Sequence, residues 1–439
     1  MGLFFGTDGL RGIVNKDLTQ NIAFKIGNAL AVLNKNPKVL IGSDTRISGS
    51  FIALGVASGV MAGGGSVLDL GVVPTAGVAY LTKTLGYDYG VVISASHNSG
   101  EYNGIKVFGS GGYKLGEKEE EQIERCFLNE KINAYPNIGS YKQDLNAIKL
   151  YRDYLISSSK NRFEGLTIVL DCAYGASHKI APEVFKRLGA KVIASNAQDN
   201  GLKINDKCGA LYPEKLEGRI KRYKADVGFA FDGDSDRLIV ATENGEVING
   251  DVIISSLAKY YKSLGKLKED TVVGTSHTNM GIEADLKENG IKLIRTDIGD
   301  KYVLAKLVEK DLSLGGEQSG HIILKELATT GDGILSAIAV LNMLIDLKKK
   351  ASEVFNTNLY PQVNINVIVG DKFKVLNSEL LSKALVKHNI EMGDKGRIMI
   401  RASGTEPKIR IMVESKDREV NEQIALDLEE IVRKVDIEK

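Results

Sequence analysis

The sequence has few cysteines and almost no net charge, and both shortages exclude classes of protein. Its three cysteines, Cys126, Cys172 and Cys208, are far apart and form no CxxC pair, which argues against a disulfide framework or a zinc knuckle and fits a reducing compartment. The 57 basic and 56 acidic residues nearly cancel, so no net field favours nucleic acid or an anionic membrane. Any anion must therefore be bound by a local site.

The sequence also lacks a recognisable targeting or membrane-spanning segment. MGLFFGTDGLRG has no basic region and no long apolar run, so it does not predict a signal peptide, and Gly6 stands where myristoylation needs Ser or Thr. Residues 51–68 are uncharged, but three glycines at 63–65 interrupt them and predict a short buried helix followed by a turn. We therefore expect a cytoplasmic protein with no nucleic-acid or membrane partner.

A length of 439 residues predicts several domains, and a repeated pattern divides most of the chain. Residues 39–71, 167–196 and 271–297 each begin with an apolar strand, continue through a polar loop and a helix, and end in a second strand. This pattern predicts three related α/β domains with parallel strands. From Val363 onward the order is strand, helix, two strands and helix, which predicts a smaller α+β domain. We place the domains at residues 1–148, 149–249, 250–361 and 362–439.

A polar loop that follows the apolar residues 91–93 is the first candidate site. It carries Ser96 beside His97, but adjacent residues on an extended chain point in opposite directions, so we expect a poor nucleophile–base pair. The hydroxyl could instead carry a phosphoryl group, whose charge a metal ion and cations would hold. Plain turns also contain such residues, so this hypothesis depends on partners elsewhere in the chain.

A cluster of aspartates after the apolar segment ADVGFAF is the second candidate. Asp232, Asp234 and Asp236 place like charges close together, which is unfavourable unless a cation neutralises them. An EF-hand is excluded because Arg237 occupies the position that needs glycine and because strands flank the loop. Oxygen ligands without nearby Cys or His favour Mg²⁺ or Ca²⁺, and the adjacent arginine suits a Mg²⁺ that shares a phosphate with the protein.

Three glycine-rich loops offer further polar groups. In the loop at residues 6–12, Arg11 lies among glycines that allow a ligand to approach the backbone, although an ordinary tight loop has the same composition. The loop at residues 315–321 offers polar groups that suit sugar hydroxyls, namely Glu317, Ser319 and His321. His321 could equally be a core residue. The loop at residues 401–410 has an arginine at each end and hydroxyls between them, and we expect it to bind phosphate.

Taken together and in this order, the segments GTDGLRG, SASHN with NGIK, DGDSDR, GEQSGH and RASGTEP resemble the α-D-phosphohexomutase superfamily over essentially the whole chain. The resemblance implies three related mixed-sheet α/β domains and a smaller C-terminal α+β domain, arranged around a central active-site cleft. It also implies that Ser96 is a phosphoserine and that Mg²⁺ is bound by this phosphate with Asp232, Asp234 and Asp236.

The resemblance further implies an isomerase that moves phosphate through a 1,6-bisphosphate, with glucosamine or glucose 1,6-bisphosphate as activator. Lys106 and Arg237 would stabilise the transferring group, and Lys106 or His97 would handle the hydroxyl proton. Relatives suggest a homodimer. The substrate contacts expected from the motifs are Arg11, Asp300, Lys301, Glu317, Ser319, His321, Arg401, Ser403, Gly404, Thr405 and Arg410.

Within the superfamily, ISASHN, GEQSGH, TTGDG and YPQVNINV are most similar to the branch that acts on glucosamine phosphates. Glucose and mannose phosphates remain the alternative substrates, because one amino group is a small difference to read from loops. The sequence departs from the usual pattern at Ser99, Tyr102 and Lys301, where proline, aspartate and arginine are common. Since the loop length is kept, we expect the position of Ser96 to be preserved.

Overall fold

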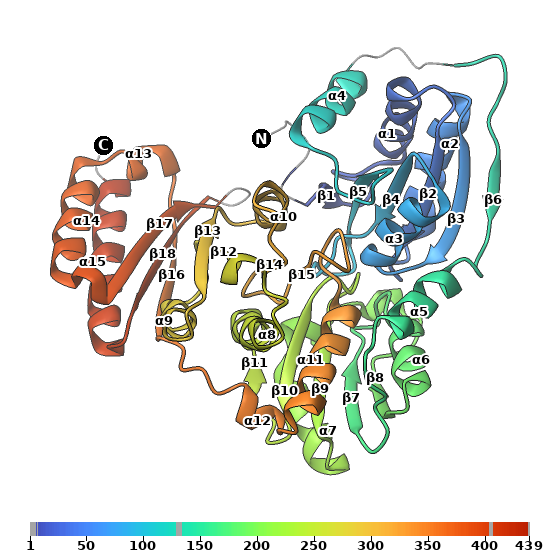
Figure 1. Cartoon of the computed structure of the whole chain (residues 1–439). Coiled ribbons are helices and arrows are strands. Elements are labelled where there is room, and N and C mark those ends of the chain that lie inside the picture. The colour runs from blue at the N-terminus through green and yellow to red at the C-terminus, as the bar shows by residue number, and fades with distance from the viewer. Residues whose placement is uncertain (1–5, 7, 129–133, 404–406, 438–439) are drawn as a thin grey trace. The chain divides into compact units, whose positions relative to one another are not determined.

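The computed structural model describes residue 6 and residues 8–128, 134–403 and 407–437. The chain divides into two compact units (Figure 1). One unit comprises Met1–Thr278 with Leu286–Asn356, and the other comprises Asn279–Asp285 with Thr357–Lys439. In the described ranges, no helix combines the length and the hydropathy needed to cross a membrane.

The first sheet has six strands in the order β1-β5-β4-β2-β3-β6. Strands β2, β3, β4 and β6 are parallel, β5 is antiparallel to β4, and β1 is antiparallel to β5. The strands are β1 (Leu10–Ile13), β2 (Lys38–Ser43), β3 (Ser66–Val72), β4 (Tyr89–Ile93), β5 (Tyr102–Gly109) and β6 (Tyr141–Gln143). The helices are α1 (Gln20–Leu33), α2 (Gly49–Ala62), α3 (Thr75–Leu85) and α4 (Glu117–Leu128).

Helices α1 and α2 pack together through glycines. A Cβ atom at Gly27 would lie 2.0 Å from the carbonyl oxygen of Val56, and one at Gly59 would lie 1.9 Å from that of Phe24. The two backbones therefore touch, which only glycine permits. The apolar run at residues 51–68 thus forms the buried helix and turn predicted from its glycines.

The second sheet has five strands in the order β11-β10-β9-β7-β8. Strands β7, β8 and β9 are parallel, and β10 returns antiparallel to β9. The strands are β7 (Thr167–Asp171), β8 (Lys191–Ser195), β9 (Val227–Phe231), β10 (Leu238–Thr242) and β11 (Val247–Ile248). The helices are α5 (Ile148–Ser157), α6 (Ile180–Arg187) and α7 (Leu216–Tyr223).

The third sheet has four strands in the order β13-β12-β14-β15. Strands β12, β13 and β14 are parallel, and β15 returns antiparallel to β14. The strands are β12 (Thr271–Thr275), β13 (Lys292–Thr296), β14 (Leu314–Gly316) and β15 (Ile322–Leu324). The helices are α8 (Gly250–Ser263), α9 (Met280–Glu288), α10 (Asp300–Glu309), α11 (Gly333–Leu347) and α12 (Ala351–Val354).

These three sheets share one topology. In each, four strands numbered along the chain lie in the order 2-1-3-4, namely β3-β2-β4-β5, β8-β7-β9-β10 and β13-β12-β14-β15. The first three strands are parallel, and a hairpin leads to the antiparallel fourth. The prediction of three related mixed-sheet domains is therefore confirmed. The equivalent hairpin of each sheet carries one candidate loop: the serine loop between β4 and β5, the aspartate loop between β9 and β10, and the GEQSGH loop between β14 and β15.

The second unit is built on a three-stranded antiparallel sheet in the order β16-β18-β17. Its core contains Val367, Ile411, Val413, Leu428 and Val432. The strands are β16 (Gln362–Ile368), β17 (Gly396–Ala402) and β18 (Lys408–Ser415), and the helices are α13 (Lys372–Leu376), α14 (Glu379–Met392) and α15 (Arg418–Ile437). This is the smaller α+β domain expected from the sequence.

Candidate active site

The aspartate loop, residues 232–237, is contacted by segments from all three related domains of the first unit. Backbone N–H groups donate to it from three directions: Ala176 to Gly233 at 2.7 Å, Thr75 to Asp234 at 3.1 Å, and Gly333 to Ser235 at 2.9 Å. A backbone bridge also joins Arg237 to His321 of the GEQSGH loop. The position of the aspartate loop is thus fixed by backbone contacts from each of the three related domains.

Ser96 lies against this loop and is 1% exposed. Its Oγ donates to Oδ2 of Asp232 at 2.6 Å, although 136 positions separate the two residues. Its backbone has φ of 51°, in the left-handed region that residues with a side chain seldom adopt. The structure thus brings together the serine and the first aspartate that the sequence predicted as partners.

One inference about Ser96 was wrong. We expected Ser96 and His97 to point apart, as on an extended strand, but Ser96 Oγ lies 3.4 Å from Nδ1 of His97. The left-handed conformation of Ser96 turns the two side chains to the same side. Burial, Arg237 and Arg11 lower the pKa of His97 to about 3, so its imidazole is neutral near pH 7.

The three aspartates form a compact group of buried oxygens. One carboxylate oxygen from each of Asp232, Asp234 and Asp236 lies within 4.8 Å of the others. Burial, with the neighbouring carboxylates Asp236 and Asp234, raises the pKa of Asp232 well above its usual range. Oδ1 of Asp234 has no hydrogen-bond partner among the described residues. A divalent cation with a preference for oxygen fits this group, because it would balance the charge and use the vacant oxygen.

A buried lysine faces the same carboxylates. Nζ of Lys106 lies 2.8 Å from Asp234, 3.3 Å from Asp236 and 2.8 Å from Asp8. Burial would lower the pKa of Lys106, but these carboxylates outweigh burial and raise it well above the usual value. Lys106 is therefore a cation, and it balances part of the negative charge. The guanidinium of Arg237 lies farther away, with Nε 4.0 Å from both Asp232 and Asp236.

The ion pairs continue from Asp8 to the third domain. Lys114 contacts both Asp8 and Asp300, and Arg11 also contacts Asp8. Burial would raise the pKa of Asp8, but Lys106, Lys114 and Arg11 hold it well below its usual range. Asp300 begins helix α10. The predicted residues Arg11, Lys106 and Asp300 therefore belong to one network, which Asp8 and Lys114 complete.

The GEQSGH loop adds an imidazole and a carboxylate. Nδ1 of His321 lies 3.5 Å from Asp236, and its Nε2 lies 3.5 Å from Asp300 and 3.1 Å from the backbone nitrogen of Gly331. Burial would lower the pKa of His321, but Asp236 and Asp300 raise it to about 9. Glu317 accepts from the N–H of Gly299 at 3.1 Å, and burial raises its pKa. Oγ of Ser319 has no hydrogen-bond partner in the described parts of the chain.

A buried arginine that the motifs did not single out holds the serine loop. Nε of Arg46 forms an ion pair with Asp44 at 2.9 Å. Its two Nη groups donate to four loop carbonyls: Ser96 at 3.0 Å, Asn98 at 2.7 Å, Tyr102 at 2.9 Å, and Ser99. Five backbone and side-chain acceptors therefore fix one guanidinium, and through it the loop.

Asn205 of the second domain also forms hydrogen bonds to the serine loop. Its Nδ2 donates to the carbonyls of Ser96 at 2.8 Å and Asn98 at 3.0 Å. Both of these carbonyls also accept from Arg46. Nothing in the local sequence around Asn205 indicates this role, because the contact exists only once two domains are packed together.

The remaining predicted site residues are Lys301 and the residues of the C-terminal loop. Lys301 pairs with Glu117 of α4 at 3.1 Å and lies over the ring of Tyr302, so its ammonium is already engaged. In the second unit, Arg401 and Arg410 lie directly opposite each other on β17 and β18. Burial and the nearby Arg410 lower the pKa of Arg401, as expected where two cations share a site suited to an anion. Ser403 is buried beside them, whereas Gly404 and Thr405 lie outside the described residues.

The site combines a buried serine hydroxyl, a cluster of carboxylates that offers only oxygen ligands, and several cations. This combination is typical of metal-assisted phosphoryl transfer. Sequence models of the phosphoglucomutase/phosphomannomutase family match the chain in four parts. They are alpha/beta/alpha domain I at residues 2–134, domain II at 147–245, domain III at 249–360 and the C-terminal domain at 365–431.

Full-length relatives agree with these matches. The chain is 46% identical over 444 residues to a phosphoglucosamine mutase of Caldanaerobacter subterraneus subsp. tengcongensis, with 99% of each chain covered. It is 42% identical over 447 residues to the phosphoglucosamine mutase of Clostridioides difficile, again with 99% of each covered. A family protein from Burkholderia thailandensis has the same fold, with a TM-score of 0.83 at 22% identity over 98% of this chain and 97% of that one.

The chain therefore belongs to the phosphoglucomutase/phosphomannomutase family, over its whole length. It is accordingly an isomerase that moves a phosphoryl group within a sugar phosphate.

Proposed function

We propose that this protein interconverts glucosamine 6-phosphate and glucosamine 1-phosphate. The observation that carries the proposal is the 2.6 Å hydrogen bond between the Ser96 hydroxyl and Asp232, which presents a buried hydroxyl to the carboxylate group. The choice of glucosamine is supported by full-length relatives named phosphoglucosamine mutase at 42% to 46% identity.

In the proposed reaction, Ser96 carries a phosphoryl group. The free 1-hydroxyl of glucosamine 6-phosphate attacks this phosphorus, the P–Oγ bond of Ser96 breaks, and the sugar hydroxyl loses its proton. The product is glucosamine 1,6-bisphosphate. After the bisphosphate turns over, Oγ of Ser96 attacks the 6-phosphate, so glucosamine 1-phosphate leaves and the phosphoserine is restored. Phosphate is neither gained nor lost in the cycle.

The neighbours of Ser96 have charges suited to these steps. The neutral imidazole of His97, 3.4 Å from Oγ, is able to accept a proton, whereas the cationic Lys106 is able to donate one. Lys106 and Arg237 also stabilise the charge that develops on the transferring group. Because Asp234 and Asp8 keep Lys106 protonated, we assign the acid role to Lys106. A base role for His97 requires a pKa above about 3, and the negative charge of a phosphoryl group on Ser96 would raise it.

The carboxylate group of Asp232, Asp234 and Asp236 would hold Mg²⁺ together with the serine phosphate. Bound there, the ion would polarise the phosphoryl oxygens and so make the phosphorus easier to attack. A solved structure of the Aspergillus fumigatus N-acetylphosphoglucosamine mutase contains magnesium and N-acetylglucosamine 6-phosphate, and another contains glucose 1,6-bisphosphate. We propose the same metal here, with glucosamine or glucose 1,6-bisphosphate as activator.

Substrate contacts are proposed from the remaining polar groups. Glu317 and Ser319 would bind sugar hydroxyls, and Ser319 has an unused hydroxyl for this purpose in the described chain. Arg11 and His321 would bind the phosphate, and Asp300 would accept from a sugar hydroxyl while it pairs with Lys114. We assign the non-reacting phosphate to the C-terminal loop, because this loop is rich in hydrogen-bond donors. The proposed contacts are Arg401, Ser403, Gly404, Thr405 and Arg410. Among the proposed substrate contacts, Lys301 has the least support, because its ammonium already pairs with Glu117.

The experiment that tests this function is a mutase assay with Mg²⁺ and glucose 1,6-bisphosphate, comparing kcat/KM for glucosamine, glucose and mannose phosphates. Glucosamine phosphate should be preferred, and Ser96→Ala should abolish turnover while Ser94→Ala, a serine two residues away, should retain part of it. Equal or better rates on glucose or mannose phosphate would instead make the protein a phosphoglucomutase or phosphomannomutase. Release of inorganic phosphate without isomerisation, or full turnover by Ser96→Ala, would refute the mechanism.

We also propose the assembly and domain division that the resemblance implies. The protein would be a cytoplasmic homodimer with small sugar phosphates as its ligands and neither nucleic acid nor membrane as a partner. Its domains would be residues 1–148, 149–249, 250–361 and 362–439. Sedimentation equilibrium at several concentrations measures the oligomeric state, and a monomer at micromolar concentration would contradict the dimer.

A further inference from the structure

A second cavity lies away from the phosphoryl-transfer site, with a volume of about 530 Å³. Its walls are the end of α8 with the turn after it, one face of α11, and the segment after α5. It therefore lies where the second and third domains meet, which is a common place for a small-molecule site, and its volume is in the usual range for one. None of the residues proposed above for catalysis lines it.

The floor of the cavity is apolar. Leu335, Ile338 and Ala339 come from three positions along α11, and each is buried. Leu324, at the end of β15, and the more exposed Leu264 and Leu327 extend this floor. Such a surface favours an aromatic or branched aliphatic body over a free sugar phosphate, which has little apolar area to bury.

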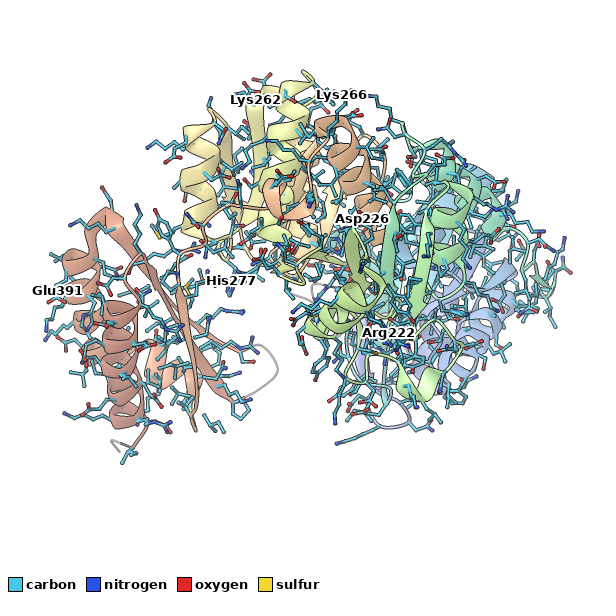
Figure 2. All side chains as sticks on the ribbon, turned by 90° about the horizontal axis from the view of Figure 1, so that it is seen from below. Arg222, Asp226, Lys262, Lys266, His277 and Glu391 are labelled. Carbon is cyan, nitrogen blue, oxygen red and sulfur yellow. The ribbon has the colours of Figure 1, made fainter. Side chains whose placement is uncertain are left out.

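Two of the three lysines at the cavity are already neutralised. Lys160 pairs with Asp346 at 2.8 Å, and Lys268 pairs with Asp311 at 3.0 Å and Glu326 at 2.8 Å. Lys266, in the turn after α8, forms no ion pair with any described residue (Figure 2). The cavity therefore has one uncompensated positive charge at its rim.

Two neutral donors beside the floor are also unused. Asn342, which is 8% exposed, accepts through Oδ1 from Ser159 at 3.2 Å and from the N–H of Asn161 at 3.0 Å, so its NH₂ group has no partner in the described chain. The hydroxyl of Tyr261 likewise forms no hydrogen bond to the described residues, whereas that of the adjacent Tyr260 donates to Asp346. The polar groups without a partner in the described chain are thus two hydrogen-bond donors and one cation. They are complementary to a negatively charged acceptor.

We propose that this cavity binds a small amphipathic anion, with an apolar ring system or branched chain on the α11 floor and a carboxylate or similar anionic group near Lys266. The Asn342 NH₂ and the Tyr261 hydroxyl supply hydrogen bonds to its acceptors. This inference is independent of the proposed sugar-phosphate reaction, because the two sites share no residue.

Fluorescence titration of the full-length protein with 1-anilinonaphthalene-8-sulfonate tests the proposal, since this probe joins an aromatic body to one sulfonate. The neutral N-phenyl-1-naphthylamine serves as the probe without the charge. We expect saturable binding of one sulfonate probe per chain that glucosamine 6-phosphate does not displace. Lys266→Ala should weaken the sulfonate probe about fivefold and leave the neutral probe unchanged.

Matched variants separate this site from general surface binding. Lys262, one turn earlier, pairs with Asp270 at 3.1 Å and donates to the carbonyl of Gly290, and it does not line the cavity (Figure 2). Lys262→Ala should therefore leave both probes unchanged. Leu327→Trp, at a half-exposed position on the floor, should exclude both probes without disturbing the buried core. Melting curves would verify that each variant is folded.

Four outcomes would overturn the proposal, and the first three concern the probe and the lysine variants. They are the absence of saturable binding, equal weakening by Lys262→Ala and Lys266→Ala, and displacement of the probe by glucosamine 6-phosphate. Unchanged binding to Leu327→Trp would also overturn it, because the probe would then lie elsewhere.

Discussion

Replacing Asn205 with alanine removes both hydrogen bonds by which the second domain holds the carbonyls of Ser96 and Asn98. Each such bond contributes about 1 kcal/mol, and the left-handed backbone of Ser96 is unfavourable by about 1–2 kcal/mol. The two quantities are similar, so losing these bonds should let Ser96 leave its position against Asp232. Because Arg46 still binds both carbonyls, we expect kcat to fall about tenfold, which corresponds to about 1.4 kcal/mol.

The assay compares kcat and KM for glucosamine 6-phosphate in Asn205→Ala and in a matched control. Asn196 has the same kind of left-handed backbone, with φ of 47° against 58° for Asn205, and its Nδ2 also donates two hydrogen bonds, both to Asp171. Asn196→Ala should therefore lose similar stability but keep its kcat. KM should change by less than about twofold in Asn205→Ala, because Asn205 donates to the backbone of the serine loop and is not one of the proposed substrate contacts. Equal kcat values for the two variants would refute the positioning role.

Three further variants test the charges described above. Asp232→Asn should abolish turnover yet raise the free energy of unfolding of the metal-free protein by about 1–2 kcal/mol in denaturant titrations, because it removes one of three buried like charges; a loss of stability would contradict this. Asp332 accepts from the Tyr151 hydroxyl and caps α11, and burial raises its pKa to about 6. The folded state thus favours the protonated form of Asp332. The contribution of Asp332 to the free energy of unfolding is therefore fully present below pH 4 and is lost as the pH rises through 6. Asp332→Asn should remove that loss and be more stable than wild type by about 3 kcal/mol at pH 7 but not at pH 4, and equal differences at both pH values would show that the charge is not responsible. Arg401→Ala should raise KM about tenfold with a smaller effect on kcat, and an unchanged KM would exclude a phosphate contact at Arg401.

The repeated fold was predictable because its signals are local. Each apolar strand is followed by a polar loop and a helix, and this order alone predicts a parallel pair. The aspartate triad was also predictable, since alternate carboxylates after a buried strand are unfavourable without a cation. Rejection of an EF-hand was correct, because the flanking segments β9 and β10 pair as an antiparallel hairpin.

What could not be predicted depends on packing between distant segments or on a single dihedral angle. Arg46 and Asn205 act through carbonyls of a loop 50 and 109 positions away from them, measured to Ser96, and neither stands in a glycine-rich motif. Lys114, which links Asp8 to Asp300, follows the glycine-rich residues 109–112, which the motifs did not single out. The relation of Ser96 to His97 was mispredicted because one left-handed residue reverses the direction of its neighbour.

The division of one site among three hairpins has a consequence for the synthesis of the chain. Ser96 and Lys106 leave the ribosome long before Asp232, and His321 follows later still, so the nascent first domain holds the proposed nucleophile without its carboxylate partners. Until the second domain has folded, Asn205 is not in place to grip the serine loop. We therefore expect the growing polypeptide to be inert toward sugar phosphates until the three related domains have assembled.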